Sequence, residues 1–328
     1  MTRRACVSVV AAVVLLFGSA AAEIAPGSHY QLSPGWPELP EGRVLGSAAG
    51  VGVTSKGEVL VFHRAGRVWS EPLPLTLIAQ PTIAVFDTAT GKFLREWGAN
   101  QFAVPHGLVV DGHDNVWVTD VALQQVFKFS PEGKLLMVLG ERGVSGADER
   151  HFNRPTDVAV LPDGSFYVSD GYLNTRIVKF SAEGKFLFQW GRPGSGPGEF
   201  NVPHAVVIDK TGRVYVADRE NDRVQVFDEA GRFLMQIKSR DIGRPYGLAF
   251  LSDGRLVIAD GGEQPESGPD RSAVVIVAAD GHVLQRFGRF GNYDGQFEMA
   301  HEVAVDGMDN IYVVDITGHR VQKLTPNR

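Results

Sequence analysis

Three histidines lie at the same position of a repeated sequence unit. His106, His204 and His301 each begin a segment of one pattern, and nearly equal stretches of chain separate them, each long enough for two repeats. If six repeats close into a ring, alternate repeats carry a histidine, and the three imidazoles lie one third of a turn apart around the axis. Three imidazoles that face one axis can bind a divalent metal ion and leave a position for water or a substrate oxygen. The spacing therefore predicts metal-dependent chemistry, with zinc favoured and iron, cobalt or copper as alternatives.

The repeated unit indicates the fold that positions these histidines. Six segments share the pattern, and they begin near Ala49, His106, Thr156, His204, Tyr246 and His301. Each contains short runs rich in Val, Ile, Phe and Tyr that alternate with turn signals such as DGHDN and PDGS. A single four-stranded unit cannot bury both of its faces, whereas radial stacking of six such units can. The sequence therefore predicts an all-β fold, a six-bladed β-propeller, and no stretch has a sustained helical period.

The chain is expected to have three parts. Residues 1–22 contain two arginines, a short apolar run and a small-residue end, which is typical of a secretory signal peptide. Residues 23–48 form an N-terminal segment, and residues 49–328 form the propeller. The last repeat stops after its third strand, near Leu324, so we expect its fourth strand to come from the N-terminal segment around His29–Leu32. Such a closure would remove two exposed sheet edges.

The composition of the chain indicates where the protein is located and which kinds of partner it has. The 328-residue chain has a formal net charge of −6 with its charges scattered, which argues against nucleic acid as a partner. The only cysteine, Cys6, lies inside the predicted signal, so the mature chain is expected to have no disulfide. No later apolar stretch is long enough for a membrane span in the mature chain. We therefore expect a secreted or periplasmic protein.

Residues shared by the repeats are expected to be structural. An aspartate lies at a fixed distance after five of the six anchors, where its carboxylate can hold the following turn. These aspartates are Asp120, Asp170, Asp218, Asp260 and Asp315, and the recurring arginines Arg176, Arg223 and Arg320 are their expected partners. In the first repeat His63 takes the place of the aspartate.

Departures from the repeat are the candidates for function. Arg64 and Arg219 follow the aspartate position in the first and fourth repeats, and Tyr172 lies one place further on in the third. Because successive strands run antiparallel, these residues and the histidines are expected at one end of the central channel. Tyr172 suits a general base where positive charge is near, and a guanidinium suits a substrate carboxylate. The structural alternatives are a channel-lining aromatic for Tyr172 and an exposed side chain for either arginine.

Three long motifs connect the chain with a known family. The runs VTDVALQQVFK, VSDGYLNTRI and ADRENDR resemble motifs of the peptidylglycine α-hydroxyglycine α-amidating lyases, and the resemblance covers about residues 45–325. That family has a six-bladed propeller fold and splits a peptidyl α-hydroxyglycine into a peptide amide and glyoxylate. The resemblance implies that His106, His204 and His301 bind zinc and that Tyr172 is the base, with Arg64 beside it. It also implies that Arg219 and Met299 lie in the substrate pocket.

A structural calcium ion is a second implication of the resemblance. The backbone carbonyls of Val51 and Leu108 match two of its ligands, and Glu302 stands where the family has an aspartate. A carboxylate beside backbone carbonyls is a suitable shell for a hard cation. The extra methylene of Glu302 is expected to shift or weaken this site. The disulfides of animal members have no counterpart here, where Leu173 and its neighbours stand.

Two other functions stay open from the sequence. A metal-dependent hydrolase such as a lactonase occurs on six-bladed propellers, but such sites rely on carboxylate-rich calcium ligation. A non-catalytic binding propeller is the second alternative, since fold alone does not separate these functions. The hydroxylating copper monooxygenase is not found in this chain. Either a separate monooxygenase supplies the substrate, or the natural substrate is a small N-acyl-α-hydroxyglycine.

Overall fold

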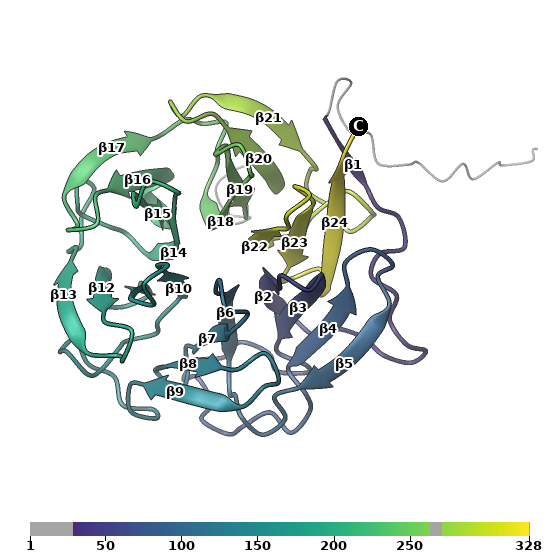
Figure 1. Ribbon diagram of the computed structural model, residues 1–328, viewed down its shortest axis with the longest axis horizontal. Coiled ribbons are helices and arrows are strands. Elements are labelled where there is room, and N and C mark those ends of the chain that lie inside the picture. The colour runs from purple at the N-terminus through teal and green to yellow at the C-terminus, as the bar shows by residue number, and fades with distance from the viewer. Residues whose placement is uncertain (1–28, 263–270, 328) are drawn as a thin grey trace, which may run out of the picture.

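Six four-stranded antiparallel sheets surround a central axis (Figure 1). The computed structural model describes residues 29–262 and 271–327, so the predicted signal peptide lies outside the described residues. Among these residues, no helix has the length and apolar character that a membrane crossing requires. The arrangement confirms the predicted six-bladed β-propeller.

The strands of each blade follow one another outward from the axis, apart from the last strand of blade 6. Blade 1 contains β2 (Ala48–Val53), β3 (Glu58–His63), β4 (Ile83–Asp87) and β5 (Phe93–Trp97). Blade 2 contains β6 (Pro105–Val110), β7 (Val116–Asp120), β8 (Gln125–Phe129) and β9 (Leu135–Leu139). Blade 3 contains β10 (Asp157–Val160), β11 (Phe166–Asp170), β12 (Arg176–Phe180) and β13 (Phe186–Trp190).

The second half of the ring repeats this order. Blade 4 contains β14 (Pro203–Ile208), β15 (Val214–Asp218), β16 (Arg223–Phe227) and β17 (Phe233–Ile237), with the 3₁₀ helix η1 (Arg219–Asn221) after β15. Blade 5 contains β18 (Pro245–Phe250), β19 (Leu256–Asp260), β20 (Ala273–Val277) and β21 (Val283–Phe287). Blade 6 contains β22 (Ala300–Val305), β23 (Ile311–Asp315), β24 (Arg320–Pro326) and β1 (Tyr30–Leu32).

Burial differs between the strands of one blade because of their position in the ring. The second strand, for example β7 or β15, is buried along its whole length because neighbouring blades cover both of its faces. The outermost strand, for example β13, alternates between half-buried and exposed residues. Apolar contacts join adjacent blades, as where the ring of Trp117 in β7 packs 4.6 Å from that of Phe166 in β11. The core is therefore a set of interfaces between blades.

The repeated aspartates connect each blade to the chain that enters it. In five blades this carboxylate accepts backbone N–H groups of the entering segment, for example Asp120 from Ala103 and Val104. Arg176, Arg223 and Arg320 pair with the aspartates of their own blades. The carboxylates of these aspartates are fully buried, so the ion pairs and backbone hydrogen bonds offset their desolvation.

Closure of the ring joins the two ends of the described chain. β1 pairs antiparallel with β24, with Tyr30 opposite Pro326 and Leu32 opposite Leu324. This is the segment that the sequence indicated as a candidate for the role. The Tyr30 ring is buried and stacks 5.7 Å from that of Phe287 in blade 5. The first strand therefore completes blade 6 and also contacts the blade before it.

A chain that begins at Pro34, without β1, is expected to be less stable by about 2–4 kcal/mol. The loss follows from the exposure of the Tyr30 side chain and the neighbouring apolar surface of blade 6. Urea denaturation measures the free energy of unfolding, with a chain that begins at His29 as the matched control. Equal unfolding midpoints for the two chains would show that β1 does not support the ring.

Candidate active site

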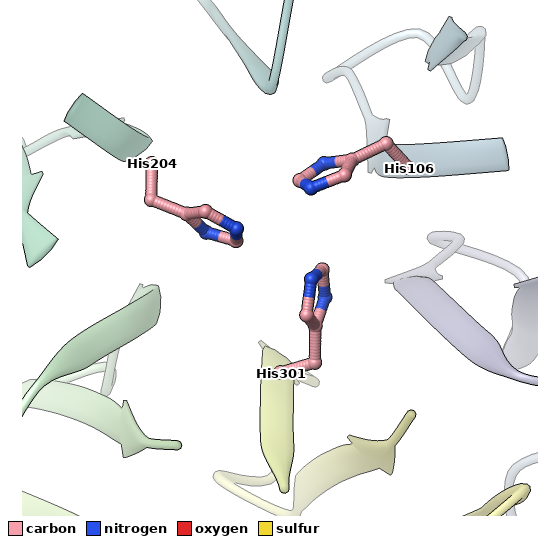
Figure 2. A group of neighbouring side chains, drawn as sticks. All are labelled: His106, His204 and His301. Atoms are coloured by element: carbon pink, nitrogen blue, oxygen red, sulfur yellow. The ribbon is translucent and has the colours of Figure 1, made fainter. Parts of the chain in front are cut away.

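Three histidine side chains converge on the axis at one end of the ring (Figure 2). His106, His204 and His301 lie near the start of the innermost strands β6, β14 and β22, each at a shift in strand register. Such irregularities re-aim side chains. The three ring centroids are 4.8–4.9 Å apart, and one nitrogen of each ring lies within 4.8 Å of those of the others. All three side chains are buried.

Each imidazole is oriented by the backbone of another blade. In every case Nδ1 donates a hydrogen bond to the carbonyl of the anchor residue in the next blade. The pairs are His106 Nδ1 with Thr156 O at 2.8 Å, His204 Nδ1 with Tyr246 O at 2.8 Å, and His301 Nδ1 with Ala49 O at 2.7 Å. This bond fixes the tautomer and leaves the Nε2 lone pair directed toward the axis, as in protein metal sites.

The histidines have the protonation that a metal site requires. Burial is the main factor that lowers their pKa values. Nearby arginines lower all three further, and neighbouring histidines also lower those of His106 and His204. The pKa of His301 falls to about 3, and those of His106 and His204 lie well below the ordinary value. His204 Nε2 is buried without a hydrogen-bond partner among the described residues. Neutral imidazoles with such an unpaired nitrogen fit a divalent metal ion.

Tyr172 lies beside this cluster, in the connection between β11 and β12. Its hydroxyl group is 3.1 Å from His106 Nε2, and its ring is 5.3 Å from the His106 ring. Since Nδ1 of His106 carries the proton, the tyrosine hydroxyl donates this hydrogen bond. The ring of Trp69 packs 5.7 Å from the ring of Tyr172 on its other side. The sequence-predicted base and a candidate metal ligand are therefore in contact.

Two arginines flank the tyrosine, Arg64 buried and Arg219 half-buried. Arg64 Nε donates to Pro105 O at 2.9 Å, and its guanidinium lies 5.1 Å from the Trp69 ring. Arg219 lies over two aromatic rings, 5.4 Å from that of Tyr172 and 4.7 Å from that of Tyr246. Burial lowers the pKa of Arg64, whereas Tyr172, Tyr246 and Glu220 outweigh burial and raise that of Arg219. Both side chains remain cations at neutral pH and can pair with a substrate carboxylate.

A cavity of about 670 Å³ opens over these residues. Of the predicted site residues, its lining includes Arg64, Tyr172, Arg219, Met299 and His301. The structure thus brings Met299 to the same cavity as the two arginines.

Three residues of this neighbourhood were not identified from the sequence. Tyr246 and Trp69 also line the cavity, and Glu220 accepts a 2.8 Å hydrogen bond from Arg219 Nε. Tyr246 had a signal in the sequence, because it is the anchor of the fifth repeat. Trp69 had none, because it lies in an irregular connection.

Deeper in the channel, the residues predicted to hold calcium are buried. Val51 and Leu108 lie on the neighbouring strands β2 and β6, which approach so closely that a Cβ atom at Gly50 would be 2.6 Å from Leu108 N. Burial, and then the charge of Asp157, raises the pKa of Glu302 well above its usual range. Burial also raises the pKa of Asp157 to about 7. The sequence analysis missed Asp157, although it follows Thr156 as Glu302 follows His301.

Comparison with known proteins supports the same family as the motifs. A family model described as the NHL repeat matches residues 152–180 and 200–227. Peptidyl-glycine alpha-amidating monooxygenase B of Xenopus laevis is 35% identical over 92% of this chain. The chain covers 36% of that protein, about a third of its length. Peptidyl-alpha-hydroxyglycine alpha-amidating lyase 2 of Drosophila melanogaster is 35% identical over 88% of this chain and 73% of the lyase.

Solved structures agree on the fold. A streptogramin B lyase superposes with a TM-score of 0.59 over 91% of this chain and 98% of its own, at 13% sequence identity. At this identity the likeness shows the fold alone. The similarity in sequence is the stronger finding, because it extends across nearly the whole propeller. On this basis, the chain belongs to the family of peptidyl-alpha-hydroxyglycine alpha-amidating lyases.

Proposed function

We propose that this protein is a metal-dependent lyase that cleaves the C–N bond of a peptidyl or N-acyl α-hydroxyglycine. The products are an amide and glyoxylate. Its relatives are named for this reaction. The observation that carries the proposal is one cavity whose lining includes Tyr172, Arg64 and Arg219, with the Tyr172 hydroxyl group in contact with the cluster of three neutral histidines.

The charge of the cavity suits the substrate. An α-hydroxyglycine has a carboxylate next to the carbon that carries the hydroxyl group. Arg64 provides a buried guanidinium group and Arg219 a half-buried one, and such groups pair well with a carboxylate. Among the described residues, Arg64 donates to a backbone carbonyl and not to an acid, whereas Arg219 Nε donates to the carboxylate of Glu220.

Each group of site residues has a separate role in the proposed reaction. The three imidazoles would hold a zinc ion, which when bound supplies Lewis acidity at the substrate hydroxyl. In its phenolate form, without the proton that it donates to His106 Nε2 when no metal is bound, Tyr172 accepts the substrate hydroxyl proton. The carbonyl of glyoxylate forms as the C–N bond breaks. The departing amide nitrogen takes up one proton, which Tyr172 returns, so the step consumes no net proton. The arginines hold the carboxylate and offset the negative charge of the phenolate.

A calcium ion is part of the proposal for the deeper site. Val51 and Leu108 would contribute backbone carbonyls, and Glu302 would contribute a carboxylate. The buried pair Glu302 and Asp157 supports this assignment, because a divalent cation would offset the desolvation of two carboxylates. The role of this ion would be structural, since β2, β6 and β22 belong to three different blades.

The signal-peptide pattern of residues 1–22 supports a secreted or periplasmic location. A hydroxylated substrate then has two sources, a separate copper monooxygenase or a small N-acyl-α-hydroxyglycine made elsewhere. The relatives that are named monooxygenases support a peptide as the substrate.

Glyoxylate release from α-hydroxyhippuric acid tests the proposed function. We expect the purified protein to release glyoxylate, to lose this activity with a chelator, and to regain it when Zn²⁺ is added. A folded, zinc-loaded protein that releases none would favour a different metal-dependent reaction or a binding propeller. Hydrolysis of a lactone by the same protein would favour the hydrolase alternative.

A further inference from the structure

Blade 1 differs from the other blades at the position of the repeated aspartate. In the other five blades this aspartate binds the backbone of the entering segment. His63 holds the position in blade 1, and its Nδ1 accepts the N–H of Ala65 at 3.1 Å instead. The entering segment, residues 43–46, lines a cavity of about 430 Å³ with His63. We call this cavity the side pocket.

Apolar side chains form most of the side pocket. Its lining includes Leu39, Val44, Leu45, Pro81 and Phe93. Val44 is 83% exposed and Leu39 is 39% exposed, so apolar surface also reaches the solvent at its rim. The two ionic side chains of the lining, those of Arg43 and Glu96, pair with each other. The side pocket therefore favours an apolar occupant, because it offers no unpaired charged side chain to a charged one.

The side pocket adjoins the active-site cavity. Ala65, Gly66 and His319 line both cavities, and Arg64 precedes them in the chain. A Cβ atom at Gly66 would meet no other atom within 4 Å, so open space surrounds this part of the shared wall. Both cavities lie at the end of the ring where β3 ends and β4 begins. Gly66 is exposed, so an extended ligand in the active-site cavity can reach the side pocket over this open rim.

We infer that the side pocket binds the apolar side chain of the residue that precedes the hydroxyglycine in a peptide substrate. This inference rests on the proposed lyase function. With the carboxylate paired to Arg64 and Arg219, the acyl group of the substrate lies in the rest of the active-site cavity, whose wall includes Ala65 and Gly66. The preceding residue is bonded directly to the hydroxyglycine nitrogen, so its side chain is the first group available to enter. A leucine or phenylalanine side chain gains binding free energy when its apolar surface is buried there. A glutamate side chain would lose its hydration and would find no unpaired cation in the pocket to compensate for that loss.

A series of N-acetyl-X-α-hydroxyglycine substrates tests the preference, with X as glycine, alanine, leucine, phenylalanine or glutamate. We expect kcat/KM for leucine and phenylalanine to exceed that for glycine by about ten- to a hundredfold, mainly through KM. Equal kcat/KM values across the series would overturn the inference and leave the lyase function standing. Failure to release glyoxylate from any member would instead count against the proposed function.

Two variants locate the preference in the side pocket. Gly66→Leu places a side chain in the shared passage, and we expect it to lower the leucine-to-glycine ratio of kcat/KM to near one. Gly112→Leu is the matched control, because a Cβ atom there also meets nothing within 4 Å and the residue lies in the β6–β7 turn at the other end of the ring. Val44→Asp adds a charge at the exposed rim, with Val138→Asp on the outer strand β9 as its control.

The second variant keeps the test decisive if Gly66→Leu loses activity toward all substrates. We expect Val44→Asp to lower the leucine-to-glycine ratio and to improve kcat/KM for a substrate with lysine at X. Circular dichroism and zinc content show that each variant is folded and metal-loaded. Ratios equal to that of the wild type in both variants would show that the preference arises elsewhere.

Discussion

Replacing Tyr172 with phenylalanine is expected to lower kcat for glyoxylate release by about 10²- to 10⁴-fold. The substitution removes the hydroxyl group that lies 3.1 Å from His106 Nε2 and keeps the ring between Trp69 and His106. The proton acceptor is lost, whereas the three candidate ligands and the two arginines stay in place. We therefore expect KM to change little and zinc content to stay unchanged. Steady-state kinetics with metal analysis of the same sample measures both effects.

Tyr293→Phe is a suitable control for this variant, because Tyr293 is exposed and the change also removes only a hydroxyl group. Its kcat is expected to equal that of the wild type. A Tyr172→Phe enzyme that retains wild-type kcat would remove Tyr172 from the reaction. A variant that loses zinc together with activity would show that the hydroxyl group supports the metal site instead.

His204→Ala is expected to abolish glyoxylate release and to lower zinc affinity by more than about 100-fold. Loss of a residue that only orients a metal ligand costs about 10- to 100-fold in affinity, so loss of a ligand itself should cost more. His204 Nε2 is the buried nitrogen without a partner among the described residues, which makes it the clearest of the three ligands. Competition with a chromogenic chelator measures the affinity.

His282→Ala provides the comparison, because His282 is an exposed histidine that pairs with Asp280 away from the channel. It is expected to bind zinc and release glyoxylate as the wild type does. Unfolding curves recorded for both variants without metal separate a lost ligand from a lost fold. Wild-type zinc affinity in His204→Ala would exclude the three-histidine site.

The fold was largely predictable because each repeat carries its own strand and turn signals. The number of blades and the axial position of three histidines follow from periodicity alone. Blade 1 was less regular: its repeat motif ends at Trp69, but its third strand, β4, begins only at Ile83. The residues between them form a connection whose contacts are distant in sequence, such as the ion pair of Glu71 with Arg154. Local patterns contain no information about such contacts.

The site was predictable in its side chains but not in the backbone groups that support them. Each histidine is held by a carbonyl oxygen of another blade, and a carbonyl has no residue type by which a sequence could identify it. The proximity of Asp157 to Glu302 depends on how blades 3 and 6 meet across the channel. The placement of Arg219 likewise depends on the 3₁₀ helix η1, which no periodic pattern indicated.

The contact of each histidine with the next anchor has a consequence for how such a ring can evolve. The ligands and their supporting carbonyls alternate around the axis, so the smallest unit that carries one of each is a pair of blades. Duplication or loss of a single blade would place two histidine ligands, or two of the carbonyl groups that accept from them, in adjacent blades and break the alternation. Duplication of two blades at a time in an ancestral gene would have kept each histidine next to the carbonyl group that orients it.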